Sequence, residues 1–378
     1  MNVLLINSVC GYGSTGRIVL NIAKEYEQQG ATVKIAYGRR RASEDSEQYA
    51  IRIGRRMDIC SHMFRSILLD EHGLGSKHAT KRFLHWADGF DPDILWIHNI
   101  HGYYINYIEL FKWIKSRPNM QVKWTFHDCW PITGHCAHFL DSKCEKWKNG
   151  CDNCKEYRRY PISILLEQCK KNYYQKKNSF TKVSKMQIIV PADWLKNCIQ
   201  ESFLKQYDII VRKNKADENY FYIFNNYQIV KEIYSKYIDY KKIDHKKIIL
   251  GVANIWPVTK GLHDFEKLAE ILPVDEYAIV LVGLSKKQIK RVSEKILGVM
   301  RTSSRKELAA FYNGAFMYVN LSYEETFPTT NLEAVACGTP VIAYDTGGCR
   351  ETLSKHDFLV SEGDINRVAE IIMSYEKN

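Results

Sequence analysis

Short, continuously apolar runs rich in Val and Ile alternate along the chain with amphipathic helical patterns. Continuous rather than alternating apolar strands, separated by helices, are typical of a parallel sheet covered on both faces. The cycle starts again after residue 246, so the pattern predicts two doubly wound α/β domains. The predicted strands are residues 3–9, 33–37, 94–98, 122–127, 186–191 and 208–211, then 247–253, 277–282, 316–321 and 340–344; predicted helices include 16–29, 107–116 and 367–375.

A polar stretch rich in Asn, Lys and Tyr separates the two cycles at residues 212–247. It carries no buried-strand pattern and therefore predicts a linker followed by a surface helix. We place the boundary between residues 213 and 214, which suits a chain of 378 residues. Ligands of open α/β sheets bind beyond the carboxyl ends of the strands, so we expect the two domains to face each other across a ligand-binding cleft.

Composition adds an asymmetry of charge to this picture. Apolar residues make up 45% of the chain, which excludes a disordered protein, and the net charge is +11. Residues 1–212 hold 32 Lys or Arg against 21 Asp or Glu, whereas the remainder holds 22 of each. The first domain is therefore predicted to meet an anionic partner, with nucleic acid, a membrane face and phosphorylated substrates all open.

The sequence predicts a cytoplasmic protein. Its first residues, MNVLLINSVCGYG, lack the features of a signal peptide, and no apolar run reaches the ~18 residues of a spanning helix. Most of the 11 cysteines are scattered singly in apolar surroundings. Cys60, Cys169, Cys198 and Cys337 are accordingly predicted to be free, buried thiols in a reducing compartment.

A glycine motif follows the first predicted strand. Gly11, Gly13 and Gly16 match the G-x-G-x-x-G of dinucleotide sites, where backbone approaches a pyrophosphate at a helix N-terminus. The acidic residue expected at the end of the next strand is missing, and residues 39–41 are three arginines instead. An NADP-dependent reductase is thus one alternative, but a general phosphate- or acceptor-facing loop is favoured, because such turns are common in α/β folds.

The second domain carries a denser constellation in the segment NLSYEETFPTTNLEAVACGTPVIAYDTGGCRE. Pro328 marks a helix start, with Thr330 and Asn331 in the first turn. The free N–H groups there suit a diphosphate, and Glu333 is placed to accept hydrogen bonds from a ribose. Glu325 lies in the preceding loop.

Further groups converge on the same strand ends. Lys260 precedes Gly261 after the first strand of this domain, so its ammonium can reach the same site and stabilise a diphosphate leaving group without a metal. Gly347 and Gly348 follow another strand and allow a ligand close to the backbone. Each feature alone is common in structural roles; their convergence favours a nucleotide-sugar site.

These motifs resemble the group-one retaining glycosyltransferases of GT-B architecture, which pair two Rossmann-like domains. The resemblance rests on Glu325 and Glu333 with seven residues between them, the run NLEAVACGTPVIAYDTGG, Lys260-Gly261 and the upstream RTSSRKELAAFYNGAFMYVN, and in the first domain on the glycine loop, IHNIHG and FHDCWPITGHC. The branch that builds capsule, exopolysaccharide or O-antigen repeat units is the most similar. The chain departs from the family in lacking an arginine shortly before Lys260 and glycines after Glu325.

The resemblance implies a role for each matching residue. The catalytic set would be Lys260 on the donor diphosphate, Glu325 on the donor-sugar hydroxyls and His127 reaching the donor sugar from the first domain. Donor-binding residues would be Glu333 on the ribose, backbone N–H groups of Thr330 and Asn331 on phosphate, and the glycines Gly347, Gly348, Gly13 and Gly16. It also implies retention of configuration, no catalytic metal, an acceptor-binding first domain (1–213) and a donor-binding second domain (214–378).

Other polar residues of the first domain are open to several interpretations. His127 and Asp128 end a strand, where a ligand or neighbours must satisfy them, whereas His98 and His101 are predicted to be packed or capping. Cys136, Cys144, Cys151 and Cys154 have the ligand number of a structural zinc site, with free thiols as the equal alternative.

The charge excess is concentrated in recognisable stretches. Residues 170–185 interleave Lys with Tyr and Phe, and arginines at 39–41, 55, 56, 158 and 159 add to it. A solvated helix face and contact with an anionic membrane leaflet are equally compatible with this pattern, and a basic, zinc-containing nucleic-acid binder is a further alternative.

The sequence therefore predicts a retaining glycosyltransferase. It would move a hexose from a nucleotide-diphosphate sugar, with a UDP-sugar favoured, to a lipid-diphosphate-linked glycan at the cytoplasmic face of the inner membrane, in the synthesis of bacterial surface polysaccharide such as O-antigen or capsule. No nucleic-acid partner is expected.

Overall fold

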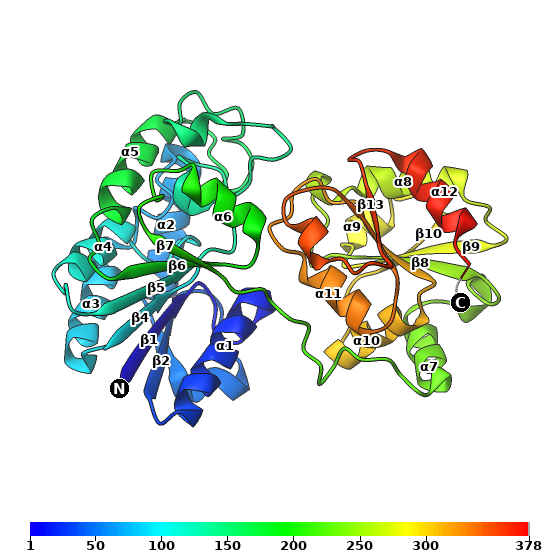
Figure 1. Cartoon of the computed structure of the whole chain (residues 1–378), viewed down its shortest axis with the longest axis horizontal. Helices are drawn as coiled ribbons and strands as arrows, with labels where there is room; N and C mark the ends of the chain where they lie inside the picture. The colour runs from blue at the N-terminus through cyan, green and yellow to red at the C-terminus, as the bar shows by residue number, and fades with distance from the viewer. Residues whose placement is uncertain (377–378) are drawn as a thin grey trace. The chain divides into compact units, whose positions relative to one another are not determined.

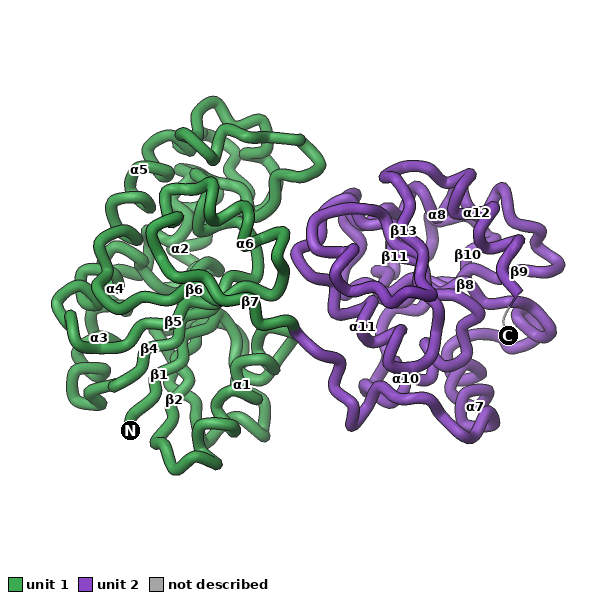
Figure 2. The backbone as a smooth tube through the Cα atoms, in the orientation of Figure 1, with its two compact units in different colours: residues 1–213 green, residues 214–378 purple. Residues whose placement is uncertain are grey.

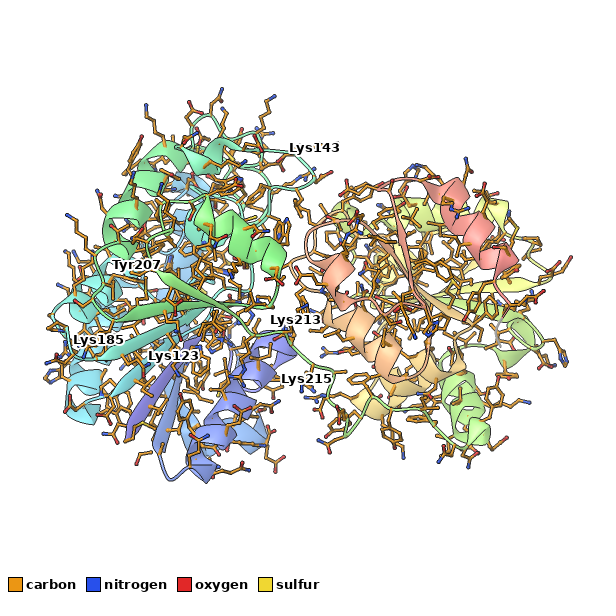
Figure 3. The ribbon with its side chains drawn as sticks, viewed as in Figure 1. Lys123, Lys143, Lys185, Tyr207, Lys213 and Lys215 are labelled. Atoms are coloured by element: carbon orange, nitrogen blue, oxygen red, sulfur yellow. The ribbon has the colours of Figure 1, made fainter. Side chains whose placement is uncertain are left out.

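A computed structural model of the chain describes residues 1–376. The chain divides into two compact units, residues 1–213 and 214–378, shown in green and purple in Figure 2. The division falls between the same two residues at which the sequence predicts a domain boundary. Lys213 and Lys215 lie in the segment that leaves the last strand of the first unit (Figure 3).

Unit 1 is a seven-stranded parallel sheet in the order β3-β2-β1-β4-β5-β6-β7 (Figure 1). Its strands are β1 (Asn2–Asn7), β2 (Thr32–Tyr37), β3 (Ala50–Arg52), β4 (Ile94–Ile97), β5 (Gln121–Thr125), β6 (Met186–Val190) and β7 (Asp208–Val211). Its α-helices are α1 (Gly13–Gln28), α2 (Arg56–Leu69), α3 (Lys77–Phe90), α4 (Tyr107–Lys115), α5 (Cys169–Phe180) and α6 (Asp193–Gln200).

Unit 2 repeats the plan with a six-stranded parallel sheet in the order β10-β9-β8-β11-β12-β13. The strands are β8 (Lys247–Val252), β9 (Tyr277–Val282), β10 (Ile296–Val299), β11 (Met317–Asn320), β12 (Val341–Tyr344) and β13 (Phe358–Val360). The helices are α7 (Tyr227–Tyr237), α8 (Leu262–Ile271), α9 (Lys286–Ile289), α10 (Arg305–Gly314), α11 (Thr329–Ala336) and α12 (Ile365–Ser374).

Both sheets are buried on both faces, as their continuously apolar strands predict. Alternate residues of a strand point to opposite faces, so in β1 Leu4 and Ile6 enter one core cluster and Val3 and Leu5 enter another. The same division occurs in β8, where Ile249 and Leu250 belong to different clusters. The doubly wound α/β prediction is therefore confirmed for each unit.

Three strands escape prediction from the sequence, namely β3, β10 and β13. Each lies at an edge of its sheet, has only three or four residues and is partly exposed. Edge strands need no continuous apolar run because only one side of the strand is paired and covered. The first helix also begins at Gly13, three residues before the predicted start.

The chain order reverses within each sheet next to its first strand. In unit 2, β8 lies between β9 and β11. The chain therefore runs outward from β8 to one edge of the sheet through β9 and β10, and then to the other edge through β11, β12 and β13, with the connecting helices on opposite faces. In unit 1, β1 is placed in the same way between β2 and β4. Such a switch point opens a crevice beyond the strand ends, where α/β proteins bind ligands.

None of the helices formed by residues 1–376 is both long enough and apolar enough to cross a bilayer.

Candidate active site

The loops that follow β8, β11 and β12 build the candidate site of unit 2. These three strands are neighbours in a parallel sheet, so their carboxyl ends lie along one edge. The predicted site residues follow them in that order, with Lys260 after β8, Glu325 after β11 and Gly347 after β12. The topology thus gathers residues that are far apart in sequence.

A close backbone contact holds Lys260 in place. A Cβ on Gly261 would lie 2.1 Å from the carbonyl oxygen of Leu321, and the φ of Gly261 is +71°, so only glycine fits here. The adjacent carbonyl oxygen of Thr259 accepts hydrogen bonds from the backbone N–H of Tyr323, at 2.8 Å, and from the hydroxyl of Ser322, at 3.3 Å. The loop bearing Lys260 is therefore fixed to the loop bearing Glu325.

Lys260 and Glu325 form an ion pair, in which Nζ donates to Oε1. Their side chains are 30% and 13% exposed, so the pair is partly shielded from water yet open to a ligand. The buried thiol of Cys349 lies close by: burial raises its pKa, and the charge of Glu325 adds to this effect while Lys260 opposes it. The two predicted catalytic residues of this unit are thus brought together.

The loop that precedes Lys260 has an aromatic anchor. Trp256 is buried, and its indole N–H donates to the carbonyl oxygen of Val282, at the end of β9, over 3.0 Å. This loop is the place where the related family has an arginine, and here the packed indole fixes its path.

The start of α11 agrees with the sequence prediction, since Pro328 is its N-cap residue and Thr329 its first helical residue. Asn331 has a structural role that the sequence did not predict. Its side chain is fully buried, accepting from Asn320 and donating to Thr352, both at 2.9 Å, and its backbone N–H donates to the carbonyl of Pro328 at 3.2 Å. Phosphate binding by the backbone of Thr330 and Asn331 stays a prediction.

Glu333 is oriented by a buried tyrosine. The hydroxyl of Tyr312 donates to Oε2 of Glu333 at 3.0 Å, and burial together with the carboxylate raises the pKa of that tyrosine. One carboxylate oxygen is thereby positioned on the first turns of α11. Its predicted contact with a ribose stays a prediction.

Sequence reasoning missed a buried network that supports the loops. Asp264, in the first turn of α8, accepts hydrogen bonds from the hydroxyls of Tyr323, at 2.5 Å, and Tyr344, at 3.1 Å. The hydroxyl of Thr346 in turn donates to the carbonyl of Tyr323 at 2.9 Å, which ties the Gly347-Gly348 turn to the Glu325 loop. No motif signals these contacts, because each joins residues at least 20 positions apart.

Unit 1 places its candidate residue, His127, in a histidine pair beyond β5. Nε2 of His127 lies 3.0 Å from Nδ1 of His98, and the two rings stack with centroids 5.3 Å apart. Burial lowers the pKa of His127 to about 4 and that of His98 well below its usual range, so both rings are neutral at pH 7. His98 is packed, as predicted.

Asp128 has partners of its own. Its carboxylate accepts from Nε2 of His101 at 2.8 Å and from the backbone N–H of Trp130 at 2.9 Å. Burial alone would raise the pKa of Asp128, but His101 overrides that effect and lowers it to about 2. The opposite nitrogen of His101 lies 3.0 Å from the hydroxyl of Tyr160. Neighbouring side chains therefore satisfy both residues of the predicted pair.

The glycine loop of unit 1 has separable roles. A Cβ on Gly11 would collide with Ser43, and one on Gly16 would press on Val9, so these two glycines are needed for packing. Gly13, by contrast, has a φ of +66° with open space around it, at the first residue of α1. Its backbone is the part of the motif that a ligand could approach.

The cysteine-rich loop does not form a recognisable metal centre. Cys154 accepts hydrogen bonds from Cys136 and also from Cys169, which lies outside the predicted set, and these bonds lower the pKa of the Cys154 thiol. Within residues 1–376, no three His, Cys, Asp or Glu side chains are arranged as metal ligands. The zinc site formed by Cys136, Cys144, Cys151 and Cys154 stays a prediction.

Two expectations about the surface of unit 1 are wrong. Cys60 is exposed on α2 rather than buried, although Cys169, Cys198 and Cys337 are buried as predicted and all 11 cysteines are free. Lys176, inside the basic stretch 170–185, is buried: its ammonium donates to the carbonyls of Trp130 and Thr133, at 2.7 and 3.0 Å, and lies over the Trp130 ring. It anchors a loop instead of adding to a basic surface.

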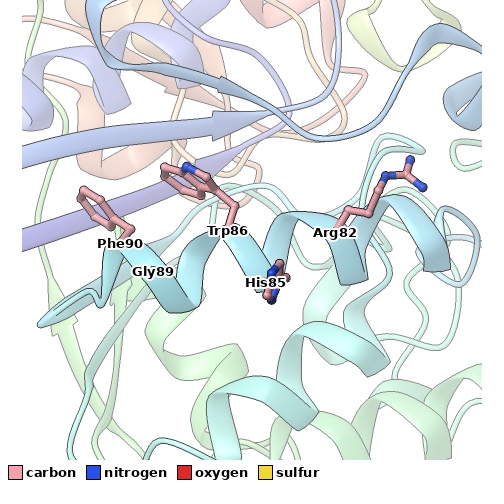
Figure 4. A pocket seen from close by; sticks show the side chains of 5 residues that line it. All are labelled: Arg82, His85, Trp86, Gly89 and Phe90. Carbon is pink, nitrogen blue, oxygen red and sulfur yellow. The ribbon is translucent and has the colours of Figure 1, made fainter.

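A surface hollow on α3 lies away from the candidate residues. Arg82, His85, Trp86, Gly89 and Phe90 line it, and all belong to this helix (Figure 4). Phe90 ends α3 just before β4 begins, so the hollow is near the amino ends of the strands. Ligands of such sheets bind at the opposite edge.

Comparison with known proteins finds a family match within unit 2. Residues 236–378 match the family model of glycosyl transferases group 1. A putative colanic acid biosynthesis glycosyl transferase, WcaC, of Escherichia coli is 27% identical over 170 residues, 43% of this chain and 41% of the relative. An N,N'-diacetylbacillosaminyl-diphospho-undecaprenol alpha-1,3-N-acetylgalactosaminyltransferase of Campylobacter jejuni is 32% identical over 128 residues, 33% of this chain and 32% of the relative. The matches thus span less than half the length of these relatives.

Solved structures show the fold of the whole chain. A sucrose-phosphate synthase from Thermosynechococcus elongatus matches with a TM-score of 0.68 at 15% identity, over 98% of this chain and 88% of that one. Anabaena HepE in complex with UDP and glucose matches with a TM-score of 0.62 at 15% identity, over 98% and 89%. The fold is the GT-B fold of glycosyltransferases, as the resemblance predicts.

Proposed function

We propose that this protein, whose residues 236–378 match the family model of the group 1 glycosyl transferases, is a retaining glycosyltransferase of surface-polysaccharide synthesis. It would move a hexose from a nucleotide-diphosphate sugar, with UDP-sugars the favoured donors, to a lipid-diphosphate-linked glycan on an anionic membrane. The printed functions of the two curated relatives, in colanic acid synthesis and in transfer to a diphospho-undecaprenol acceptor, support this class of acceptor.

The observation that carries the proposal is the ion pair of Lys260 and Glu325 at a switch point, close to the start of α11. A diphosphate entering the site would take over the ammonium of Lys260. The freed Glu325 carboxylate could then accept hydrogen bonds from donor-sugar hydroxyls. Before the donor binds, Glu325 thus occupies the place of the diphosphate beside Lys260, and Lys260 occupies the place of the sugar hydroxyls beside Glu325.

The same groups supply the chemistry of transfer. As the glycosidic bond to phosphate breaks, negative charge develops on the diphosphate, and the ammonium of Lys260 and the positive end of α11 stabilise it. We propose that this suffices without a catalytic metal, and that the transferred sugar keeps its anomeric configuration. His127 is assigned to the donor sugar, where a neutral imidazole can donate or accept one hydrogen bond.

Single substitutions test the roles of the pair. Glu325→Ala and Lys260→Ala should each lower the rate of sugar transfer at least about 100-fold, because each removes a charged contact to donor or leaving group. The rate is measured with purified chain, nucleotide sugar and a lipid-diphosphate glycan. Lys295→Ala, which removes an ammonium that is 41% exposed, paired with the exposed Glu270 and located directly before β10, is the matched control and should leave transfer unchanged. Full activity of both site variants would overturn the assignment.

A chelator tests the metal-free part of the proposal. Transfer should continue at the same rate after EDTA treatment. A loss of transfer that added Mg²⁺ or Mn²⁺ restores would show instead that a cation neutralises the diphosphate.

A further inference from the structure

Helix α2 of unit 1 is amphipathic in the reverse sense. Its buried residues are polar, His62 and Ser66, whereas Met57, Met63 and Phe64 are exposed, by 82%, 41% and 65%. Large apolar side chains normally face the core and polar ones the water. The helix therefore turns these three large apolar residues outward, while Ile59 packs against the core.

Hydrogen bonds prevent α2 from rotating to bury them. Nε2 of His62 accepts from the backbone N–H groups of Gly73 and Gly75, both at 3.1 Å, and Nδ1 lies 3.0 Å from the hydroxyl of Ser76. A Cβ on Gly75 would lie 2.4 Å from the imidazole, so the fit is close. The outward position of the apolar residues is thus built into the fold.

A second exposed apolar segment adjoins the end of α2. Ile162, Ile164, Leu165 and Leu166 are 47%, 54%, 66% and 45% exposed. The N–H of Ile164 donates to the carbonyl of Ile67 at 2.7 Å, and that of Leu166 to the carbonyl of Leu68 at 3.2 Å. The loop therefore runs beside the last turn of α2. We call the seven exposed residues the apolar face: Met57, Met63, Phe64, Ile162, Ile164, Leu165 and Leu166.

Positive charge flanks the apolar face. Residues 55–69 and 155–171, which carry it, contain eight Lys or Arg and three Asp or Glu. Arg55, Arg56 and Arg158 are exposed directly before its two segments. Two of the eight cations are paired, Arg65 with Glu71 and Arg159 with Asp141 and Glu156, which leaves a net positive charge on the two segments. The surroundings attract anions.

We propose that the apolar face enters the interface of an anionic lipid bilayer, with the flanking arginines and lysines on lipid phosphates. Apolar side chains in a basic surround are the arrangement of interfacial membrane segments. Ile164, Leu165 and Leu166 are three consecutive exposed aliphatic residues. A loop inserted shallowly into a bilayer would bury all three in lipid. This deepens the proposed function by naming the surface through which the enzyme meets the membrane that carries its acceptor.

Vesicle flotation of the full chain tests the proposal. The wild type should float with phosphatidylcholine vesicles that contain phosphatidylglycerol, much less with phosphatidylcholine alone, and less as salt rises. Phe64→Ser with Leu165→Ser should weaken binding about tenfold or more, since two apolar side chains lose their burial in lipid. Ile164→Ser with Leu166→Ser is a second, independent pair. The matched control, Ile223→Ser with Val274→Ser, alters residues 64% and 50% exposed on unit 2 and should bind normally.

Three results would overturn the proposal. One is a wild type that does not bind anionic vesicles, and another is unchanged binding of both substituted pairs. The third is a wild-type dimer, seen by light scattering, that the same substitutions dissociate, since a second copy would then cover the apolar face. Thermal stabilisation by nucleotide sugars, measured on the same preparations, reports on the donor site of unit 2. A failure of the proposed function is therefore separable from a failure of membrane binding.

Discussion

At the scale of single residues, sequence reasoning located the charged groups of the site but not what they contact. Lys260, Glu325 and Glu333 stand out because they follow predicted strands at a spacing typical of a family. The roles of Asp264 and of the buried amide of Asn331 depend on contacts between distant segments, which no local pattern encodes. The burial of Lys176 is unpredictable for the same reason: the sequence around it is rich in lysine, and its two carbonyl partners, on Trp130 and Thr133, lie more than 40 positions away.

Because Lys176 is buried, we expect the free energy of unfolding to depend on pH in the alkaline range. Burial lowers its pKa to about 7, whereas the unfolded chain keeps the usual value near 10.5, so between these limits the unfolded state binds more protons and stability rises with pH. Wild type should gain roughly 1.4 kcal/mol per pH unit in this window from this residue. The Lys176→Met variant should lose that gain, measured as urea unfolding between pH 7.5 and 9.5. Parallel pH profiles of the two proteins would show that Lys176 stays charged.

At the scale of elements, the strands in the middle of each sheet could be predicted, whereas of the four edge strands only β7 could be. Interior strands such as β1 and β9 are continuously apolar because both faces are covered. The edge strands β3, β10 and β13 have only three or four residues and are partly exposed, so each run is too short to mark a strand in the sequence. The candidate site follows interior strands, whose ends the sequence predicts.

The contact between the loops that follow β8 and β11, at Gly261 and Leu321, predicts the effect of Gly261→Ala. Alanine at a φ of +71° costs about 1–2 kcal/mol, and its methyl group would meet the carbonyl of Leu321. The Lys260 loop should move away from Glu325, so transfer should fall at least about tenfold while the protein stays folded. Steady-state kinetics and circular dichroism measure both effects. Gly89→Ala, a helical position with open space, is the control. Normal transfer by Gly261→Ala would show that the contact is dispensable.

At the scale of the whole molecule, the sequence predicted two α/β units and their boundary, because composition and periodicity both change near residue 213. It also placed all the excess charge in unit 1. The structure refines this view, because part of that charge flanks the apolar face, which includes the outward residues of α2. Unit 1 also contains the buried histidines.

Those histidines predict that unit 1 is the acid-sensitive unit. Burial lowers the pKa of His62 to about 3 and that of His127 to about 4, and it lowers the pKa values of His72 and His98 well below the usual range. Stability from neutral buried histidines is complete above pH 6.5 and is lost as pH falls toward these values. By contrast, His245, His263 and His356 of unit 2 are exposed.

Tryptophan fluorescence can follow this loss, because seven of the eight tryptophans lie in unit 1 and Trp256 lies in unit 2. Between pH 6.5 and 4 the thermal midpoint of the fluorescence signal should fall well before that of the protease resistance of unit 2, followed by the fragments that remain. Equal sensitivity of the two signals would contradict the prediction.

The central claim is that unit 2 binds a nucleotide sugar through Lys260 and Glu325, and its most direct test is donor binding itself. Isothermal titration or thermal shift with a panel of UDP-, GDP- and dTDP-sugars should show binding of one nucleotide class, with UDP-sugars expected. Lys260→Ala should weaken it roughly 10- to 100-fold, because a hydrogen-bonded charge on the diphosphate is lost. Binding of none of these donors, or equal binding by wild type and Lys260→Ala, would contradict the account.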